Sequence, residues 1–234
     1  MNKETIIERL KLLPHPLLGG ICYDKGILYD GMPIMNLRDA CIDMAKDVIG
    51  MSNAKEILEF GTHCGHSSML WLCLSEANVT TNDLVNNTGH IEWEQSYRDY
   101  NVLSDEPGLK YVNHLYQRMF PGRFRFIGGS SYAPETYEKY KDRNYDLCFV
   151  DGDHSYEGCR KDILNAIKLN IPYILVDDYT SAEEMRRACK FPLVELVKVY
   201  ENVHNFANIG LALLKNKQYV KKNSFELSFS PDGK

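Results

Sequence analysis

The chain has 234 residues, 44% of them hydrophobic and 25% charged, which is enough to bury the core of one large α/β domain or two small ones. A formal net charge of −5 argues against nucleic acid as a partner, because nucleic-acid binding needs a basic surface. No apolar run has the length of a membrane span, the N-terminus lacks a signal-peptide core, and the seven cysteines show no zinc-binding spacing, so we expect a reduced, cytoplasmic protein.

The first fifty residues predict a hairpin followed by a helix. Residues 20–33 contain two short apolar runs on either side of an Asp-Lys-Gly sequence, a pattern that predicts a hairpin. Asn36 is a suitable helix cap, and the apolar residues after it follow helical spacing. We expect this helix to close at Gly50.

From Lys55 onward, strands and helices alternate. Short apolar runs that predict strands lie at residues 56–60, 78–83, 123–128, 145–151, 173–178, 193–201 and 209–216. Helical periodicity falls between several of them, at residues 67–75 and 157–169. This alternation predicts a doubly wound α/β fold, with a mostly parallel sheet and helices on both faces. The last two runs have only a short link between them, so we expect them to pair antiparallel at one edge of the sheet.

Residues 84–111 fit this rhythm poorly. The stretch is polar, with Trp93, Tyr97 and Tyr100 spread along it. Insertions of this kind in α/β enzymes often form lids or binding loops. The alternative is a surface excursion with a small aromatic cluster of its own.

A glycine-rich turn follows the first strand of the alternating region. Gly61 and Gly65 flank the turn, and a helix is expected to begin near Ser67, where its first N–H groups are free. Asp83 ends the next strand, where an acid can accept hydrogen bonds from two ribose hydroxyls. The spacing is G-x-x-x-G rather than the G-x-G-x-x-G of dinucleotide enzymes, so a nucleoside without a pyrophosphate is expected.

Acidic residues gather where two later strands end. Asp151 follows residues 147–150, and Asp177 and Asp178 follow residues 173–176. Neighbouring parallel strands would bring these carboxylates to one crevice, where they repel one another unless a cation is bound or some are protonated. Hard divalent cations prefer such oxygen ligands. The alternative is that Asp151 or Asp178 caps a helix or a turn.

These motifs resemble those of the class I S-adenosylmethionine-dependent methyltransferases. "EFGTHCGHSS" (59–68) resembles their first motif, and "TND" (81–83) stands where their ribose-binding acid stands. "YDLCFVDGDHSYEGCRKDI" (145–163) with "YILVDDY" (173–179) is similar to the branch of macrolide sugar O-methyltransferases and cephalosporin-hydroxylase-like proteins. The resemblance covers residues 54–215 and implies a Rossmann-like, seven-stranded sheet whose C-terminal strand is antiparallel.

The resemblance also implies a role for individual residues. A divalent cation, Mg²⁺ or Mn²⁺, would be held by Asp151, Asp177 and Asp178, and His154 would be the general base beside it. The other nearby imidazoles, His63 and His66, are expected to shape the glycine turn instead. The residues expected to bind S-adenosylmethionine are Glu59, Gly61, Thr62, Gly65, Ser67, Asp83, Ser130 and Ser131.

We therefore expect one methyltransferase domain over residues 1–234. It would comprise an N-terminal hairpin and helix (1–53), a cofactor-binding core (54–215) that contains the insertion, and a polar tail (216–234). The predicted reaction is O-methylation of a small-molecule or sugar hydroxyl, without nucleic acid or membrane as partner, in a chain that can form homo-oligomers as many relatives do. The alternatives are a nicotinamide-dependent oxidoreductase on the same sheet and a catalytically silent binding protein of this fold.

Overall fold

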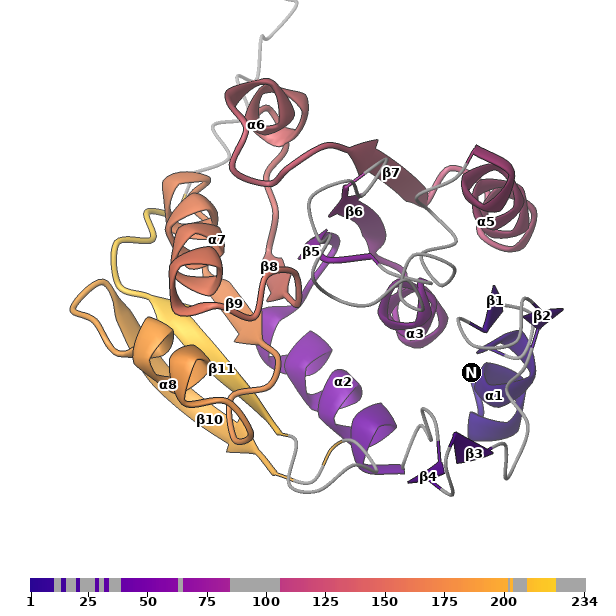
Figure 1. The fold of residues 1–234 in the computed structure, drawn as a ribbon, viewed down its shortest axis with the longest axis horizontal. Coiled ribbons are helices and arrows are strands. Elements are labelled where there is room, and N and C mark those ends of the chain that lie inside the picture. Colours follow the sequence, from indigo (N-terminus) through magenta and orange to yellow (C-terminus); the bar gives the residue numbers. More distant parts are fainter. Residues whose placement is uncertain are drawn as a thin grey trace, which may run out of the picture.

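The computed structural model describes residues 1–10, 14–15, 20–21, 28–29, 32–33, 39–62, 65–84, 106–201, 203 and 210–221 (Figure 1). Its centre is a seven-stranded sheet with the strand order β10-β11-β9-β8-β5-β6-β7. The strands are β5 (Glu56–Phe60), β6 (Asn78–Asp83), β7 (Phe124–Gly128), β8 (Leu147–Val150), β9 (Tyr173–Val176), β10 (Val194–Tyr200) and β11 (Leu211–Asn216).

The direction of the strands confirms the predicted Rossmann-like class. Strands β7, β6, β5, β8 and β9 run parallel to one another. The C-terminal strand β11 lies antiparallel between β9 and β10. Strand β10 forms one edge of the sheet, so the predicted antiparallel pair does lie at an edge.

Helices cover both faces of the sheet, and Figure 1 shows the strands running between the two groups. One face packs on α1 (Lys3–Leu10), α2 (Asp39–Ser52), α3 (His66–Leu74) and α5 (Glu106–Met119); the other packs on α6 (Pro134–Tyr140), α7 (Tyr156–Lys168) and α8 (Glu183–Cys189). Strand β8 shows why its sequence is apolar throughout. Leu147 and Phe149 belong to the first core, and Cys148 and Val150 belong to the second. Because both faces are buried, the strand has no polar side.

The end of helix α2 differs from the expected position. The helix runs past Gly50 to Ser52, and its predicted cap, Asn36, lies outside the described residues. The reversal comes at Asn53, whose φ of 48° is in the left-handed region that ends many helices. Gly50 is exposed, and an exposed glycine inside a helix costs only about 1 kcal/mol relative to alanine, so it does not stop the helix.

The N-terminal hairpin was predicted with the wrong partners. Strand β2 (Gly20–Ile21) pairs with β1 (Pro14–His15), and β3 (Leu28–Tyr29) pairs with β4 (Met32–Pro33). The two apolar runs thus each pair with a nearer segment instead of with each other. Two residues, Asp30 and Gly31, separate β3 from β4, and Asp-Gly between two strands is among the strongest hairpin signals.

The predicted insertion is partly helical. Residues 106–111 form the beginning of α5, so they are not part of an irregular excursion. Residues 85–105, with the three aromatic residues that suggested a lid, lie outside the described residues. Within the described ranges, no helix combines the length and the apolar composition that crossing a membrane requires.

Asp146 ties together the beginnings of β5 and β8. Its Oδ2 accepts hydrogen bonds from the backbone N–H groups of Lys55 (2.8 Å) and Glu56 (3.0 Å). We expect Asp146→Ala to lower the free energy of unfolding by about 1–3 kcal/mol, because two backbone donors lose a charged acceptor. Urea denaturation measures this loss, with the exposed Asp142→Ala as the control. Equal stability of the two variants would contradict the prediction.

Candidate active site

The candidate site lies at the carboxyl ends of the central strands, where the loops after β5, β8 and β9 are joined by backbone hydrogen bonds. The N–H of Asp151 donates to the carbonyl of Phe60 at 2.8 Å, and the N–H of Asp177 donates to that of Val150 at 3.0 Å. The N–H of Gly61 donates to Asn82 of β6 at 2.9 Å. The predicted glycine turn and acidic residues are therefore held together at the carboxyl ends of these strands.

Packing within the protein requires both glycines of the turn. Gly61 has a φ of 93°, and a Cβ there would lie 1.9 Å from the carbonyl oxygen of Asp151. Gly65 has a φ of 85°, and a Cβ there would lie 2.7 Å from the hydroxyl of Tyr116. That hydroxyl donates a hydrogen bond to the Gly65 carbonyl. In the structure, the loop of Asp151 and helix α5 approach the two glycines closely.

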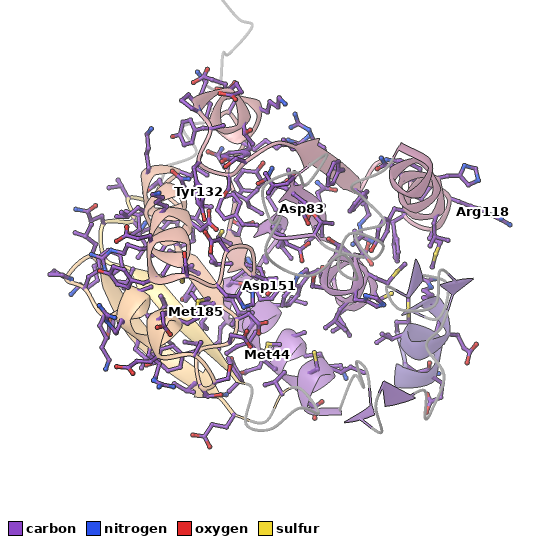
Figure 2. All side chains as sticks on the ribbon, viewed as in Figure 1. Met44, Asp83, Arg118, Tyr132, Asp151 and Met185 are labelled. Atoms are coloured by element: carbon purple, nitrogen blue, oxygen red, sulfur yellow. The ribbon has the colours of Figure 1, made fainter. Side chains whose placement is uncertain are left out.

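Asp83 is fixed against the same turn. Its Oδ2 accepts a hydrogen bond from the N–H of Thr62 at 2.9 Å, and its Oδ1 accepts one from the N–H of Leu84 at 2.7 Å. The labelled carboxylates of Asp83 and Asp151 both lie near the middle of the molecule, between the two groups of helices (Figure 2). The acid expected to bind ribose is thus held at the end of β6 next to the glycine turn.

Glu59 supports the turn from below. The side chain is 0% exposed and accepts hydrogen bonds from the hydroxyls of Ser67 and Ser68 in the first turn of α3. Burial raises the pKa of Glu59 to about 7, although the two serine hydroxyls lower it. Thr62 is also buried, and its hydroxyl is 2.5 Å from that of Thr81. The arrangement fixes the position of α3 relative to the crevice.

His154 connects the two loops that carry the acidic residues. Its Nδ1 lies 2.7 Å from Oδ2 of Asp178, and its Nε2 lies 3.2 Å from Oδ1 of Asp151. Hydrogen bonds to Asp151 and Asp178 raise the pKa of His154 to about 11. An imidazolium has an N–H on each side and so fits both carboxylates at once. In this arrangement the imidazole is protonated at neutral pH. It can act as a base only if its hydrogen bonds to Asp151 and Asp178 are lost and its pKa falls.

The three predicted metal ligands also affect one another. Burial raises the pKa of Asp151 well above its usual range, and the neighbouring charge of Asp177 raises it further. The oxygen donors are of the type that a hard divalent cation prefers. In the described part of the chain, however, no three His, Cys, Asp or Glu side chains are grouped so that they could hold a metal ion. The donor atoms suit such a cation in their chemistry, but in this arrangement Asp151 and Asp178 are both bonded to His154.

The two serines expected near the cofactor have different surroundings. The Oγ of Ser130 lies 3.3 Å from the N–H of Tyr132 and accepts its hydrogen bond, which closes a local turn. The carbonyl of Ser131 accepts hydrogen bonds from Tyr140 (3.0 Å) and Asn165 (2.9 Å), which fix this loop against α6 and α7.

Three residues near the crevice were not found from the sequence. Cys41 of α2 is buried, and burial together with the charge of Asp177 raises the pKa of its thiol to about 12. Tyr116 of α5 holds the glycine turn, and Asp162 of α7 lies beside Gly152. Cys41 and Tyr116 are far along the chain from the residues they affect, and Asp162 is one of many acidic residues in the sequence. No local pattern therefore marks any of the three. Of the two other histidines, His66 is buried and His63 lies outside the described residues.

Comparison with known proteins identifies the family. Residues 58–179, just over half of the chain, match the model of a methyltransferase domain. An O-methyltransferase from Bacillus cereus, solved in complex with S-adenosylhomocysteine, superposes with a TM-score of 0.58 at 17% identity, over 79% of this chain and 84% of that one. An O-methyltransferase of tomaymycin synthesis from Streptomyces achromogenes gives 0.52 at 16% identity, over 79% and 83%. Among curated proteins, no sequence matches significantly.

The chain therefore belongs to this methyltransferase family. Its sheet, with the antiparallel C-terminal strand, is that of the class I S-adenosylmethionine-dependent methyltransferases.

The packing of the glycine turn can be tested by substitution. We expect Gly61→Ala to destabilise the protein by more than about 1–2 kcal/mol, the cost of left-handed backbone for an L-residue, because the new Cβ also meets Asp151. Gly50→Ala is the matched control: nothing lies within 4 Å of a Cβ there, so it should stabilise α2 by about 0.5–1 kcal/mol. Opposite signs in urea denaturation are expected. A Gly61→Ala protein as stable as the wild type would refute the close approach.

Proposed function

We propose that this protein transfers the methyl group of S-adenosylmethionine to the oxygen of a hydroxyl on a small molecule or sugar. The observation that carries the proposal is the adjacency of two groups of residues. Asp83 is hydrogen-bonded to the glycine turn at one side of the crevice. His154, between Asp151 and Asp178, lies at the ends of the neighbouring strands. Residues suited to bind a nucleoside thus lie at the ends of strands next to residues suited to bind and deprotonate an acceptor, which supports the proposal.

The cofactor would lie over the ends of β5 and β6. The carboxylate of Asp83 accepts one backbone hydrogen bond on each oxygen, and an ionised carboxylate has acceptor capacity for ribose hydroxyls as well. The turn from Gly61 to Gly65 would pass along the methionine part. The absence of a third glycine at dinucleotide spacing favours S-adenosylmethionine over a nicotinamide dinucleotide.

The acceptor would lie over the ends of β8 and β9. Asp151, Asp177 and Asp178 would hold a divalent cation, which when bound lowers the pKa of the acceptor hydroxyl. Once the carboxylate partners hold the cation, His154 would lose one ring proton to solvent, and the neutral ring would then take the proton of the acceptor hydroxyl. The oxygen lone pair then forms the O–CH₃ bond while the S–CH₃ bond breaks, and S-adenosylhomocysteine is the other product. Holding both reactants in line on rigid strand ends supplies much of the acceleration.

The likeness of residues 145–163 and 173–179 to the macrolide sugar O-methyltransferases supports a hydroxyl as the acceptor. The two structurally similar enzymes named above are both described as O-methyltransferases, which agrees with this choice. The insertion at residues 84–111 is proposed to contribute to the acceptor side.

The choice of cofactor can be tested by calorimetry. S-adenosylhomocysteine should bind to the purified protein, and NAD should not. We expect Asp83→Asn to weaken S-adenosylhomocysteine by about 1–3 kcal/mol, because hydrogen bonds to a charged acceptor are replaced by weaker ones. A thermal melt of the variant shows whether the turn remains folded. Binding of NAD without a response to S-adenosylhomocysteine would overturn the assignment.

The metal site has a readout that is independent of turnover. Mn²⁺ should bind to the protein in the presence of S-adenosylhomocysteine, as seen by electron paramagnetic resonance, and Asp178→Asn should abolish this binding. Asp142→Asn, an exposed carboxylate away from the crevice, is the control and should not change it. If Mn²⁺ binds equally to wild type and Asp178→Asn, these carboxylates do not form the site.

The role of His154 requires an acceptor, which screening with radiolabelled methyl groups can supply. His154→Ala should lower the rate of methyl transfer by about 10²–10⁴-fold, the usual contribution of a general base. The affinity for S-adenosylhomocysteine should remain nearly unchanged, since the ring faces the acceptor side. A rate equal to that of the wild type would exclude His154 as the base.

A further inference from the structure

A further carboxylate is buried close to the loop after β8, on the helix that follows this strand. Asp162 of α7 is 1% exposed, and a Cβ on Gly152 would lie 3.4 Å from its Oδ2. Among the described residues, neither carboxylate oxygen has a hydrogen-bond partner of standard geometry. Burying a carboxylate without a hydrogen-bond partner destabilises the folded protein, because the group loses its hydrogen bonds to water. A buried carboxylate of this kind therefore needs a donor or a functional explanation.

The side chain of Ser131 lies close enough to act on this carboxylate. Burial raises the pKa of Asp162 to about 7, while the Ser131 side chain lowers it. Ser131 itself is only half-buried. The position of this serine is fixed, because its carbonyl is held by Asn165, which is on the same helix as Asp162.

We propose that Asp162 is a positioning residue that orients the Ser131 hydroxyl so that the serine oxygen accepts a hydrogen bond from the exocyclic amino group of the cofactor's adenine. The inference rests on the proposed function, since it needs S-adenosylmethionine in the crevice with its adenine beside the loop after β7. Ser130 is the less suitable partner, because its oxygen already accepts a hydrogen bond from Tyr132.

The physical reason is the direction of the hydrogen bonds. An ionised carboxylate can only accept, so it draws the single proton of the Ser131 hydroxyl toward α7. The serine lone pairs then face the ligand and suit an amino group, which donates. Hypoxanthine has a keto oxygen at the same ring position, and this oxygen can only accept a hydrogen bond. It would face the serine oxygen with no proton between the two acceptors. The pair Asp162–Ser131 would therefore select adenine over hypoxanthine.

The experiment compares S-adenosylhomocysteine with its deaminated analogue, S-inosylhomocysteine, by calorimetry at mildly alkaline pH, where Asp162 is ionised. The wild type should prefer the adenine compound by about tenfold or more, the scale of one hydrogen bond gained against one unpaired acceptor. Asp162→Asn should bring this ratio toward unity, because an amide can donate to Ser131 and turn its proton toward the ligand. Ser131→Ala should also bring it toward unity.

Asp142→Asn, which changes an exposed carboxylate, is the matched control, and its ratio should equal that of the wild type. A purely structural role for Asp162 would change the melting temperature and both affinities together, but not their ratio. An unchanged ratio in Asp162→Asn and Ser131→Ala overturns the inference and leaves the proposed function intact. If Asp162→Asn does not fold, Ser131→Ala alone decides. Failure of the wild type to bind S-adenosylhomocysteine would instead overturn the proposed function, and this inference with it.

Discussion

The close approach of Gly61 to the backbone of Asp151 is the constraint on which the site depends. Since a Cβ at Gly61 would lie 1.9 Å from the Asp151 carbonyl oxygen, the two loops are in direct backbone contact. The N–H of Asp151 is also bonded to Phe60, immediately before the glycine. The glycine turn and the loop that carries the acidic residues are therefore held together, and a shift of either would move the other. In the proposed function, this contact would keep the positions of methyl donor and acceptor in register.

The electrostatics of the crevice follow from this crowding. Three carboxylates end neighbouring strands, and burial and mutual repulsion raise the pKa of Asp151. His154 compensates part of this charge by bonding to Asp151 and Asp178 together. A divalent cation would compensate the same charge more completely and would free the imidazole. In the proposed function, the histidine and the cation would compete for the carboxylates, and the base would become available when the cation is bound.

The two cores of the molecule support the site from opposite faces of the sheet. Tyr116 reaches the glycine turn from α5 on one face, and Asp162 and Asn165 reach the loops after β7 and β8 from α7 on the other. Residues on helices are held more precisely than residues on loops, because their positions are fixed by packing along the whole element. The conformations of these loops thus depend on side chains of helices α5 and α7, which lie outside the loops themselves.

The sequence alone determined the class of fold and the order of its parts. Apolar runs such as residues 147–150 predicted strands buried on both faces, and the alternation with helices predicted the parallel sheet that the structure contains. Motifs at residues 59–68 and 145–163 indicated the methyltransferase family that the comparison identified. These signals are local, since periodicity and turn chemistry act within a few residues.

Only the tertiary structure decided how the candidate residues are used. It placed His154 between Asp151 and Asp178, buried Glu59 under α3, and brought Asp162 within reach of Ser131. It also corrected the end of α2 and the pairing of the N-terminal strands. These features depend on contacts between segments that are distant in the chain, or on a choice among several local turns. Burial and hydrogen bonding in the folded protein supply the free energy that decides between the alternatives.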